Sequence, residues 1–384
     1  MMRFLSSGES HGKGLNCIIE GFPANVEINV EEINEELSRR QKGYGRGKRM
    51  NIESDAIEVM AGIRFGKTIG SPISLYVRNK DWENWKLRMS SENIYHDPEL
   101  SVKAPRPGHA DLPGVIKYNQ DDIRNILERA SARETTTRTA VGAVAKQLLK
   151  VFGIEIYSRV ASLGSVEDVT VIEKGESYWT KIRESELSMY DPEAEKKTKA
   201  LIDKSKEEGD TLGGIVEVSI YNVPVGLGSH VHYDRKLDAK LAMDIMSLQA
   251  VKGFEMGAGF KTATTPGSKI HDEIVYTDGY HHKTNNAGGI EGGMSNGETI
   301  QFKAAVKPIP TLMKPLQTVD IDSKERIDAC KERSDVCAVP AAGVVMENIA
   351  AFVIANAMIE KFGGDSIEEM KANYDNYMKY VEER

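Results

Sequence analysis

Two histidines in this sequence lie in short loops whose composition suits chemistry on a bound ligand. His109 follows a proline-rich segment, with Arg106 three positions before it and Asp111 two positions after it. His11 lies between Ser10 and a glycine, where small residues let a ligand approach the backbone closely. Imidazole changes its charge near neutral pH, so His11 is a candidate proton donor. The alternative is an exposed turn histidine with no chemical role.

Guanidinium and hydroxyl groups are concentrated in residues 129–138, which read RASARETTTR. Arginine side chains make strong, directional hydrogen bonds to carboxylates and phosphates. Apolar residues recur at helical spacing in residues 137–153, which predicts a helix there. The hydroxyl-rich segment would then lie at the helix N-terminus, where free N–H groups attract anions. The segment is therefore either an anion site or a solvated basic turn before a core helix.

Two further loops are rich in glycine. Residues 39–50, RRQKGYGRGKRM, could form an RNA-binding patch, a solvated loop, or a mobile lid of arginines over an anionic substrate. The net charge of −8 favours the lid, because nucleic-acid-binding domains usually carry a net basic surface. Residues 285–297 lack the strand and helix context of a Rossmann fingerprint. They could bring backbone amides to a flat cofactor or a phosphate, or form a flexible hairpin connection.

Composition and length indicate a soluble globular protein of one large or two smaller domains. The chain has 384 residues, of which 28% are charged and 40% hydrophobic. Its three cysteines, Cys17, Cys330 and Cys337, have no CxxC spacing, so neither a disulfide framework nor a zinc site is indicated. A reducing cytoplasm is the simplest location. The N-terminus has no apolar signal-peptide core.

The longest apolar run, residues 338–359, has the length of a membrane span. Glu347 and Asn348 lie at its centre and Asn356 near its end, which makes insertion into a bilayer costly. A buried core helix is therefore predicted instead.

The elements that must position these loops follow from periodicity and end signals. Asn29 can cap a helix over 29–40, with Glu32 completing a pattern that resembles a capping box and Gly43 ending the helix. Further helices are predicted at 137–153, 191–209 and 234–253. Strands are predicted at Leu15–Glu20, Ile57–Ala61, Ser71–Val77, Ile154–Leu163, 213–224 and Thr299–Val306. These patterns alone establish a mixed α and β protein.

Several of these segments, taken together, resemble the hallmark motifs of the chorismate synthase family. They are GESHG with IIEGFP, RPGHAD, RASARETTTR and RSDVCAVPAAGVVMEN. The resemblance continues through RRQKGYGRG, LQAVKGFEMG, NNAGGIEGG and KPIPTLMKP, and so covers nearly the whole chain in the expected order. Several independent motifs at consistent spacing make a chance match implausible.

The resemblance implies the last step of the shikimate pathway, conversion of 5-enolpyruvylshikimate 3-phosphate to chorismate and phosphate. The family uses reduced FMN although the reaction has no net redox change, and NADPH is a possible reductant for the flavin. Phosphate and hydrogen leave from opposite ends of an allylic system in the anti sense, so a concerted path is unfavourable. The protein's contribution would be positioning and electrostatics around the flavin.

Residue roles also follow from the resemblance. His11 would protonate the departing phosphate, His109 would control protonation of the reduced flavin, and Asp335 would lie near the flavin N5 and accept a proton. The expected substrate contacts are Arg40, Arg46, Arg49, Arg106, Arg133 and Arg333. The expected flavin contacts are Arg129, Ala130, Ser131, Gln249, Ala250, Gly292, Lys307, Pro308, Ile309, Pro310, Thr311 and Arg333. Arg40 and Arg46 also match family positions for NADPH, but we interpret them as substrate contacts.

This sequence departs from the family pattern at two places. Gln249 stands where asparagine is common, and KPIPTLMKP replaces a serine-rich version, so the hydroxyl contacts to the flavin phosphate are in doubt there. Neither change affects the three expected acid–base residues.

The family implies an α+β fold, with helices sandwiched between antiparallel β-sheets in one domain over residues 1–384, and a homotetramer. It implies a cytoplasmic enzyme without a metal, a nucleic-acid partner or a membrane partner. The rivals are a flavin-free phosphate-ester lyase or phosphotransferase, and an RNA-binding protein that uses RRQKGYGRGKR.

Overall fold

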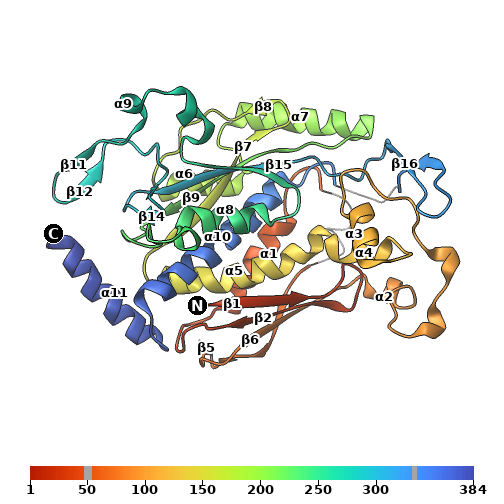
Figure 1. Ribbon diagram of the computed structural model, residues 1–384, viewed down its shortest axis with the longest axis horizontal. Helices are drawn as coiled ribbons and strands as arrows, with labels where there is room; N and C mark the ends of the chain where they lie inside the picture. Colours follow the sequence, from red (N-terminus) through yellow and green to blue (C-terminus); the bar gives the residue numbers. More distant parts are fainter. Residues whose placement is uncertain (47–53, 331–334) are drawn as a thin grey trace.

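The computed structural model describes residues 1–46, 54–330 and 335–384, and contains two antiparallel sheets with helices packed between them (Figure 1). The first sheet has the order β1 (Arg3–Ser7), β2 (Gly14–Glu20), β6 (Ile73–Arg78) and β3 (Ile57–Ala61). The second has the order β10 (Val251–Met256), β15 (Ile300–Val306), β9 (Gly214–Tyr221), β7 (Glu155–Leu163) and β8 (Val166–Glu167).

Four helices make the layer between the sheets: α1 (Val30–Gln41), α5 (Thr135–Lys150), α8 (Leu237–Met246) and α10 (Val339–Phe362). Helix α5 packs on β2 and β6, α10 packs on β7 and β9, and the two helices pack against each other. This arrangement confirms the α+β sandwich expected from the sequence.

The remaining elements lie around this core. The outer helices are α2 (Trp82–Trp85), α3 (Asp111–Tyr118), α4 (Arg124–Ala130), α6 (Glu176–Glu184), α7 (Pro192–Glu208), α9 (Gly267–Ile270) and α11 (Ile367–Glu382). The two-stranded ribbons pair β4 (Ile63–Arg64) with β5 (Lys67–Thr68), β11 (Ile274–Tyr276) with β12 (Tyr280–His282), β13 (Ile290–Glu291) with β14 (Met294–Ser295), and β16 (Gln317–Val319) with β17 (Arg326–Asp328).

The alternation of buried and exposed residues along the strands explains which face of each sheet packs on the helices. Leu15, Cys17 and Ile19 of β2 are buried while the residues between them are exposed. In β15, Ile300 and Phe302 follow the same period of two. Side chains of successive strand residues point to opposite faces, so the apolar set turns toward the helices.

Helices α5 and α10 approach closely at a glycine. A β-carbon on Gly142 would lie 2.2 Å from the carbonyl oxygen of Asn348. Only glycine fits this contact, so the spacing of the two central helices depends on it.

Helix α10 is long and apolar enough to cross a membrane, with a mean hydropathy of 1.7 over its most apolar window. In this protein 83% of that window is buried inside the fold. The prediction of a core helix is therefore confirmed.

The polar centre of α10 holds an ion network between the sheets. Glu347 is 1% exposed and accepts two hydrogen bonds of 2.9 Å from Arg39 and one of 2.8 Å from Lys146. Its carboxylate also accepts from the backbone N and the hydroxyl of Ser158 on β7, while Glu36 binds both cations. Burial alone would raise the pKa of Glu347, but Arg39 and Lys146 outweigh it and hold that pKa well below its usual range.

Two details of the predicted helices are wrong. The helix expected over 234–253 ends at Met246, because Ala250 has a φ of 71° and Val251 begins β10. The Asn29 side chain does cap α1, but Glu32 does not return to the cap: the Asn29 backbone N donates to Gln147, and Glu32 pairs with Lys150.

The buried network yields a stability prediction. We expect Glu347→Gln to destabilise the protein by about 3 kcal/mol, because it leaves the two buried cations, Arg39 and Lys146, with Glu36 as their one carboxylate in the described network. Urea denaturation at pH 7 measures this change. Glu360→Gln is the matched control: it lies on the exposed face of the same helix, and its surface pair with Lys240 should be worth under about 1 kcal/mol. Equal effects of the two substitutions would contradict this assignment.

The same carboxylate predicts a pH dependence. A carboxyl group whose folded pKa is depressed contributes its full stabilisation above the pKa of the unfolded state. That contribution is lost as the pH falls below the ordinary glutamate value of 4.5. The stability gap between the wild type and Glu347→Gln should therefore be constant near neutral pH and narrow below pH 4.5. Paired denaturation curves at pH 7 and at progressively lower pH test this, and a gap that widens in acid would refute it.

Candidate functional site

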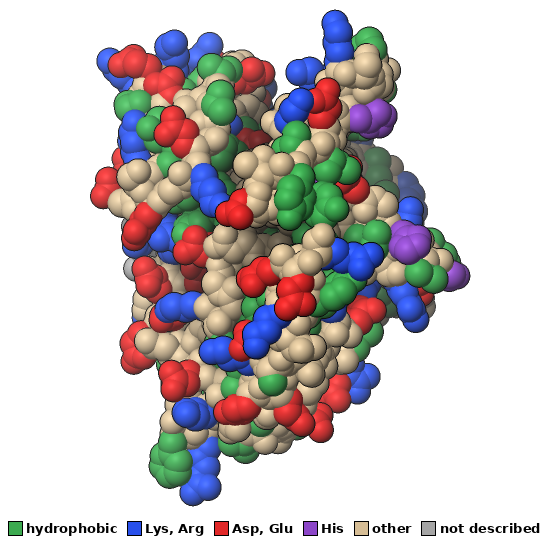
Figure 2. All heavy atoms as spheres, turned by 90° about the vertical axis from the view of Figure 1, so that its left-hand side faces the viewer, with side chains coloured by type: hydrophobic (Ala, Val, Ile, Leu, Met, Phe, Trp, Pro, Cys, Tyr) green, Lys and Arg blue, Asp and Glu red, His purple; other side chains and the backbone are tan. Residues whose placement is uncertain are grey.

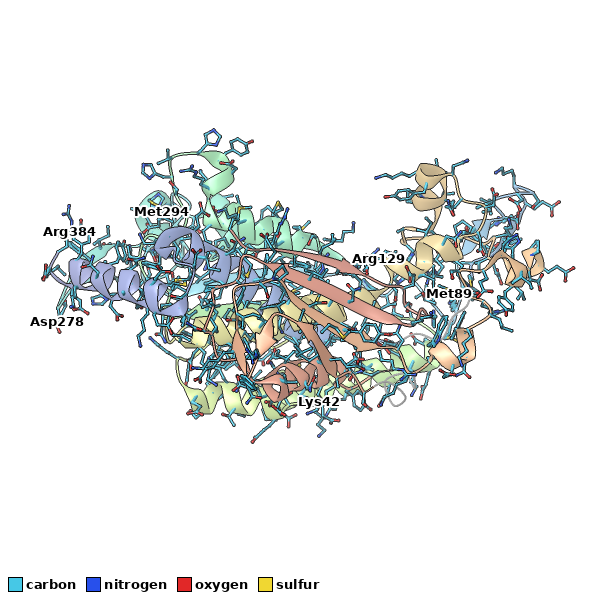
Figure 3. All side chains as sticks on the ribbon, turned by 90° about the horizontal axis from the view of Figure 1, so that it is seen from below. Lys42, Met89, Arg129, Asp278, Met294 and Arg384 are labelled. Carbon is cyan, nitrogen blue, oxygen red and sulfur yellow. The ribbon has the colours of Figure 1, made fainter. Side chains whose placement is uncertain are left out.

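The segments predicted to do chemistry gather at one end of the molecule. Helices α2, α3 and α4 and the β16–β17 ribbon lie together there (Figure 1). Figure 3 places Met89 and Arg129 at this end and Asp278 and Arg384 at the other. The loop that carries His11 joins β1 to β2.

His11 is held by a buried glutamate and an aromatic ring. It is 9% exposed, and its Nδ1 lies 2.8 Å from Oε1 of Glu128, while its backbone N donates to Glu128 Oε2 at 2.8 Å. The Trp85 ring stacks on the imidazole with a centroid distance of 4.0 Å. Burial alone would raise the pKa of Glu128, but the hydrogen bond and charge of His11, with Arg124, lower it below the usual range.

Asn79, which follows β6, organises the loop around His11. Its Nδ2 donates to the carbonyl oxygens of Glu9, Ser10 and Gly12 at 3.1, 3.3 and 2.9 Å. Its Oδ1 accepts a 2.9 Å hydrogen bond from Nε of Arg133. One buried amide therefore connects the histidine loop to Arg133, which lies just before α5.

Arg133 and Arg40, the latter from helix α1, share the buried carboxylate of Asp55. Nη1 of Arg133 lies 2.7 Å from both carboxylate oxygens of Asp55, and Nη1 of Arg40 lies 3.5 Å from one of them. Nε of Arg40 donates to the Thr135 hydroxyl at 2.9 Å. Burial lowers the pKa of Arg40 to about 9; Asp55 opposes this shift, and the charge of Arg133 adds to it.

Asp335 lies beside the same cluster. Its Oδ2 is 2.8 Å from Nη1 of Arg46, and both side chains contribute to the electrostatic field at Arg40. The backbone N of Val336 donates to Gly45 O at 3.0 Å, which joins the two segments. The expected substrate contacts Arg49 and Arg333 lie outside the described residues. The five side chains Arg40, Arg46, Arg133, Asp55 and Asp335 carry an excess of positive charge, which favours an anionic ligand.

His109 is held by its own carboxylate and arginine. Its Nδ1 is 2.5 Å from Asp111 Oδ1, and Asp111 Oδ2 accepts from Nε of Arg106 at 2.8 Å. Arg106 Nη1 also donates to the Thr311 hydroxyl at 3.2 Å, and Lys307 Nζ donates to Gly108 O. Burial alone would raise the pKa of Asp111, but hydrogen bonds from His109 and Arg106 hold it well below its usual range.

Backbone contacts connect the surroundings of His109 to those of Asp335. The Thr211 hydroxyl donates to Ile309 O at 2.7 Å, and Leu212 N donates to Val336 O at 2.9 Å. The three expected acid–base residues therefore belong to one continuous set of contacts that runs through both the arginine cluster and the 307–311 segment.

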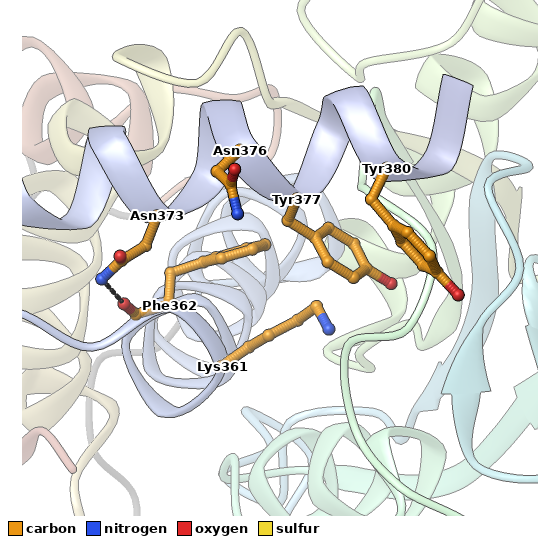
Figure 4. A pocket seen from close by; sticks show the side chains of 6 residues that line it. All are labelled: Lys361, Phe362, Asn373, Asn376, Tyr377 and Tyr380. Carbon is orange, nitrogen blue, oxygen red and sulfur yellow. Dashed lines mark hydrogen bonds between the residues drawn. The ribbon is translucent and has the colours of Figure 1, made fainter. Parts of the chain in front are cut away.

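Two surface hollows lie away from these residues. One lies between the end of α10 and α11 and is lined by Lys361, Phe362, Asn373, Asn376, Tyr377 and Tyr380 (Figure 4). There Lys361 Nζ sits 3.7 Å from the centre of the Tyr377 ring, an arrangement that fastens α11 to α10. The other borders residues 254–263. Neither contains an expected site residue, so the polar contacts, rather than a hollow, mark the candidate site.

Most expected flavin contacts lie near the two histidines. Nη1 of Arg129 donates to Gly8 O at 3.1 Å, and the Ser131 hydroxyl donates to that of Ser10 at 3.2 Å, so residues 129–131 border the His11 loop. Ala250 O accepts from Lys307 N at 2.9 Å, which places Gln249 and Ala250 beside the 307–311 segment.

Gly292 is the exception among the expected contacts. It forms the turn between β13 and β14, where the nearest atom to an added β-carbon belongs to His230. Met294 of the same ribbon lies far along the long axis from Arg129 (Figure 3). A single chain therefore does not bring Gly292 to the other expected contacts.

The structure also bears on the RNA-binding alternative. Arg39 points into the core toward Glu347, and Arg40 is buried against Thr135, so neither offers its charge to a nucleic acid at the surface. On the end of the molecule that carries α11 and the β11–β12 ribbon, basic and acidic side chains are interspersed (Figure 2). No group of three or more metal-binding side chains occurs in residues 1–46, 54–330 and 335–384.

Four residues of the site had no assigned role in the sequence interpretation: Asp55, Asn79, Trp85 and Glu128. Glu128 had a local signal, because it directly precedes the RASARETTTR segment. The others are brought to the site only by tertiary packing.

Comparisons with known proteins agree along the whole chain. The family model described as chorismate synthase matches residues 2–359. A chorismate synthase from Geotalea uraniireducens (strain Rf4) is 55% identical over 390 residues, covering 99% of each chain. One from Aquifex aeolicus (strain VF5) is 52% identical, covering 99% of this chain and 98% of its own. A solved structure described as "Crystal Structure of Chorismate Synthase" is 44% identical, with a TM-score of 0.81 and coverage of 100% and 99%.

The role of Asn79 gives a test of how the histidine loop is organised. We expect Asn79→Ala to destabilise the loop by about 1–3 kcal/mol, because buried polar partners lose their hydrogen bonds. Hydrogen exchange at the amides of residues 10–12 should become faster. Asn84→Ala is the control, since the exposed Asn84 bonds only Asp81 among the described contacts. Unchanged protection of the loop in Asn79→Ala would show that other contacts hold it.

Proposed function

Because this chain belongs to the chorismate synthase family, we propose that it catalyses the anti-1,4-elimination of phosphate from 5-enolpyruvylshikimate 3-phosphate. The product is chorismate, the last intermediate of the shikimate pathway, and the enzyme is a carbon–oxygen lyase acting on phosphates. The observation that carries the proposal is the pair of loop histidines, each fixed at Nδ1 by a buried carboxylate, together with a buried arginine cluster linked to both by chains of contacts.

The substrate is a polyanion, and the arginines supply its counter-charge. Arg40 and Arg133 pair with Asp55, and Arg46 pairs with Asp335. A bound phosphate or carboxylate would add negative charge beside all three guanidinium groups and offset their mutual repulsion. Arg106, beside His109, is a further proposed substrate contact, and Arg49 and Arg333 are proposed substrate contacts from the resemblance. Fixed cations at the departing phosphate stabilise the charge that develops on it.

We assign His11 as the acid that protonates the departing phosphate. Its backbone and ring are both held by Glu128, so the ring is oriented before substrate binds. His109 is assigned to the protonation of the cofactor, and Asp335 to accepting the proton that leaves the substrate ring. Asp335 pairs with Arg46 at 2.8 Å, which holds its carboxylate beside the arginine cluster.

The family requires reduced flavin, and we propose FMN as the flavin. The residues present fit such a group: Gln249 Oε1 is buried and accepts no hydrogen bond within the described part of the chain, as expected at a ligand contact. Arg129, Ala130, Ser131, Gln249, Ala250 and residues 307–311 would hold it, with Arg333 as a further proposed contact. When bound, reduced flavin supplies an electron that allows the two bonds to break in separate steps.

We propose a homotetramer in which Gly292 of one subunit completes the flavin site of another. The separation of Gly292 from Arg129 within one chain supports this arrangement. Each subunit is proposed to be one catalytic domain over residues 1–384. The buried thiols of Cys17 and Cys337, whose pKa values burial raises to about 12 and about 11, suit a reducing cytoplasm.

The roles of the two histidines give the central test. His11→Ala and His109→Ala should each lower turnover by roughly 10²–10⁴-fold, the usual range for a lost acid–base group, and both variants should still bind FMN. Anaerobic assays of chorismate formation with chemically reduced FMN measure turnover, and flavin spectra on substrate addition measure binding. Near-normal chorismate formation by either variant would refute the role given to that histidine, and a reaction that needs no flavin would favour a simple phosphate lyase.

NADPH is proposed as a possible electron source for the flavin, and one assay decides it. The wild-type protein is incubated in air with substrate and FMN, with NADPH as the only reductant. Chorismate formation would assign flavin reduction to this chain, and its absence would assign the reduction to a separate protein.

A further inference from the structure

Glu128 makes contacts that an ordinary structural glutamate does not need. It is 2% exposed on α4, and both of its carboxylate oxygens engage the same residue: Oε1 lies 2.8 Å from His11 Nδ1, and Oε2 accepts from the His11 backbone N at 2.8 Å. Its own carbonyl accepts from Ser10 N at 3.0 Å. These contacts fix the position of the His11 backbone and the plane of its ring together.

A second set of contacts holds the other side of the ring. The Trp85 indole stacks on the imidazole at 4.0 Å with an interplanar angle of 28°. The Arg124 guanidinium lies 5.0 Å from the centre of the indole and also donates to Glu128 Oε1 at 3.1 Å. His11, Glu128, Arg124 and Trp85 thus form a closed ring of contacts, which we call the histidine clamp.

We propose that Glu128 is a positioning residue: its carboxylate holds Nδ1 of His11 in a hydrogen bond, so that proton transfer to the departing phosphate takes place through Nε2. The proposal rests on the proposed function for the identity of the acceptor. The clamp itself, and the state of the ring that it imposes, do not depend on that function.

The chemistry follows from which nitrogen is bound to the carboxylate. An ionised carboxylate only accepts hydrogen bonds, so Nδ1 must carry a proton, and the partner of one ring nitrogen decides the role of the other. In the imidazolium form of His11, Nε2 carries a second proton. As the carbon–oxygen bond breaks, its electron pair stays with the phosphate oxygen, which takes that Nε2 proton and leaves a neutral imidazole. His11 then keeps its Nδ1 proton against Glu128. Burial alone would raise the pKa of Glu128, but the contacts with His11 and Arg124 lower it, which keeps the carboxylate ionised at neutral pH.

Glu128→Gln tests the proposal, because an amide of the same shape can place an N–H against Nδ1. Since Glu128 has no proposed contact with substrate, we expect kcat to fall on the order of 10²-fold, as for a misaligned catalytic group, with KM close to that of the wild type. Glu128→Asp keeps the negative charge on a shorter side chain, so its kcat should lie between those of the wild type and Glu128→Gln. Glu92→Gln, an exposed carboxylate near α2, is the control and should match the wild type.

The decisive measurement is which ring nitrogen of His11 carries a proton in the substrate-free protein. Long-range ¹⁵N–¹H spectra, with the His11 signals identified by their loss in His11→Ala, should show Nδ1 protonated in the wild type and in Glu128→Asp. The Nδ1-protonated form should lose population in Glu128→Gln. An unchanged spectrum with kcat within about 2-fold of the wild type would overturn the proposal, since a lost positioning contact costs far more.

Different results would contradict the role proposed for Glu128 and the function proposed for the protein. If Glu128→Gln does not fold, Glu128→Asp decides alone: wild-type kcat together with a loss of Nδ1 protonation would overturn the proposal. A ring shift in Glu128→Gln, in a protein whose wild type forms no chorismate, would refute the proposed function while supporting the clamp.

Discussion

The carboxylate of Glu347 is the interaction on which the rest of the structure depends. It lies at the centre of the helix layer and binds Arg39 of α1, Lys146 of α5 and Ser158 of β7 from its own helix, α10. A buried charge is costly without partners, so these four elements are held at one mutual position. Arg39 turns into this network and the next residue, Arg40, turns toward Thr135 and Asp55. The core network therefore fixes the position of α1 and, with it, the position of Arg40 in the candidate site.

At the site, the same principle operates with one difference. The core network is closed, with every carboxylate oxygen of Glu347 bound to a cation or to Ser158. The arginine cluster instead brings three guanidinium groups around Asp55 and Asp335. Histidines lie at both of its borders, each held through Nδ1 by a carboxylate that also binds an arginine. The charges that stabilise the core and the charges that we propose bind the ligand are thus separated along one set of helices.

The sequence predicted the elements with strong periodicity and the loops with unusual composition. The alternation in β2 and β6 and the polar centre of α10 placed these segments correctly, because local pattern and tertiary burial agree there. The end of α8 was wrong because the left-handed backbone of Ala250 and the pairing of β10 with β15 override the helical period. His11, His109 and the arginines were recognisable as candidates from their neighbours in sequence.

The partners of His109, Arg106 and Asp111, are close to it in sequence, but the partners of His11 and Arg133 had no assigned role because these contacts join distant positions. Glu128 is 117 positions from His11, and Asp55 is 78 positions from Arg133. Trp85 had no sequence signal at all, although its ring covers His11. Local patterns report burial and turns, whereas the orientation of a catalytic side chain depends on which distant residue packs against it.

The excess of guanidinium groups around Asp55 links ligand occupancy to the stability of the whole molecule. Repulsion among these groups raises the free energy of the empty native state, and an anion that binds there removes it. Any ligand that binds only the native state shifts the folding equilibrium by mass action, by about 2.7 kcal/mol at a concentration one hundred times its dissociation constant. Thermal denaturation in rising concentrations of a phosphorylated anion thus becomes a measure of the site that requires no turnover.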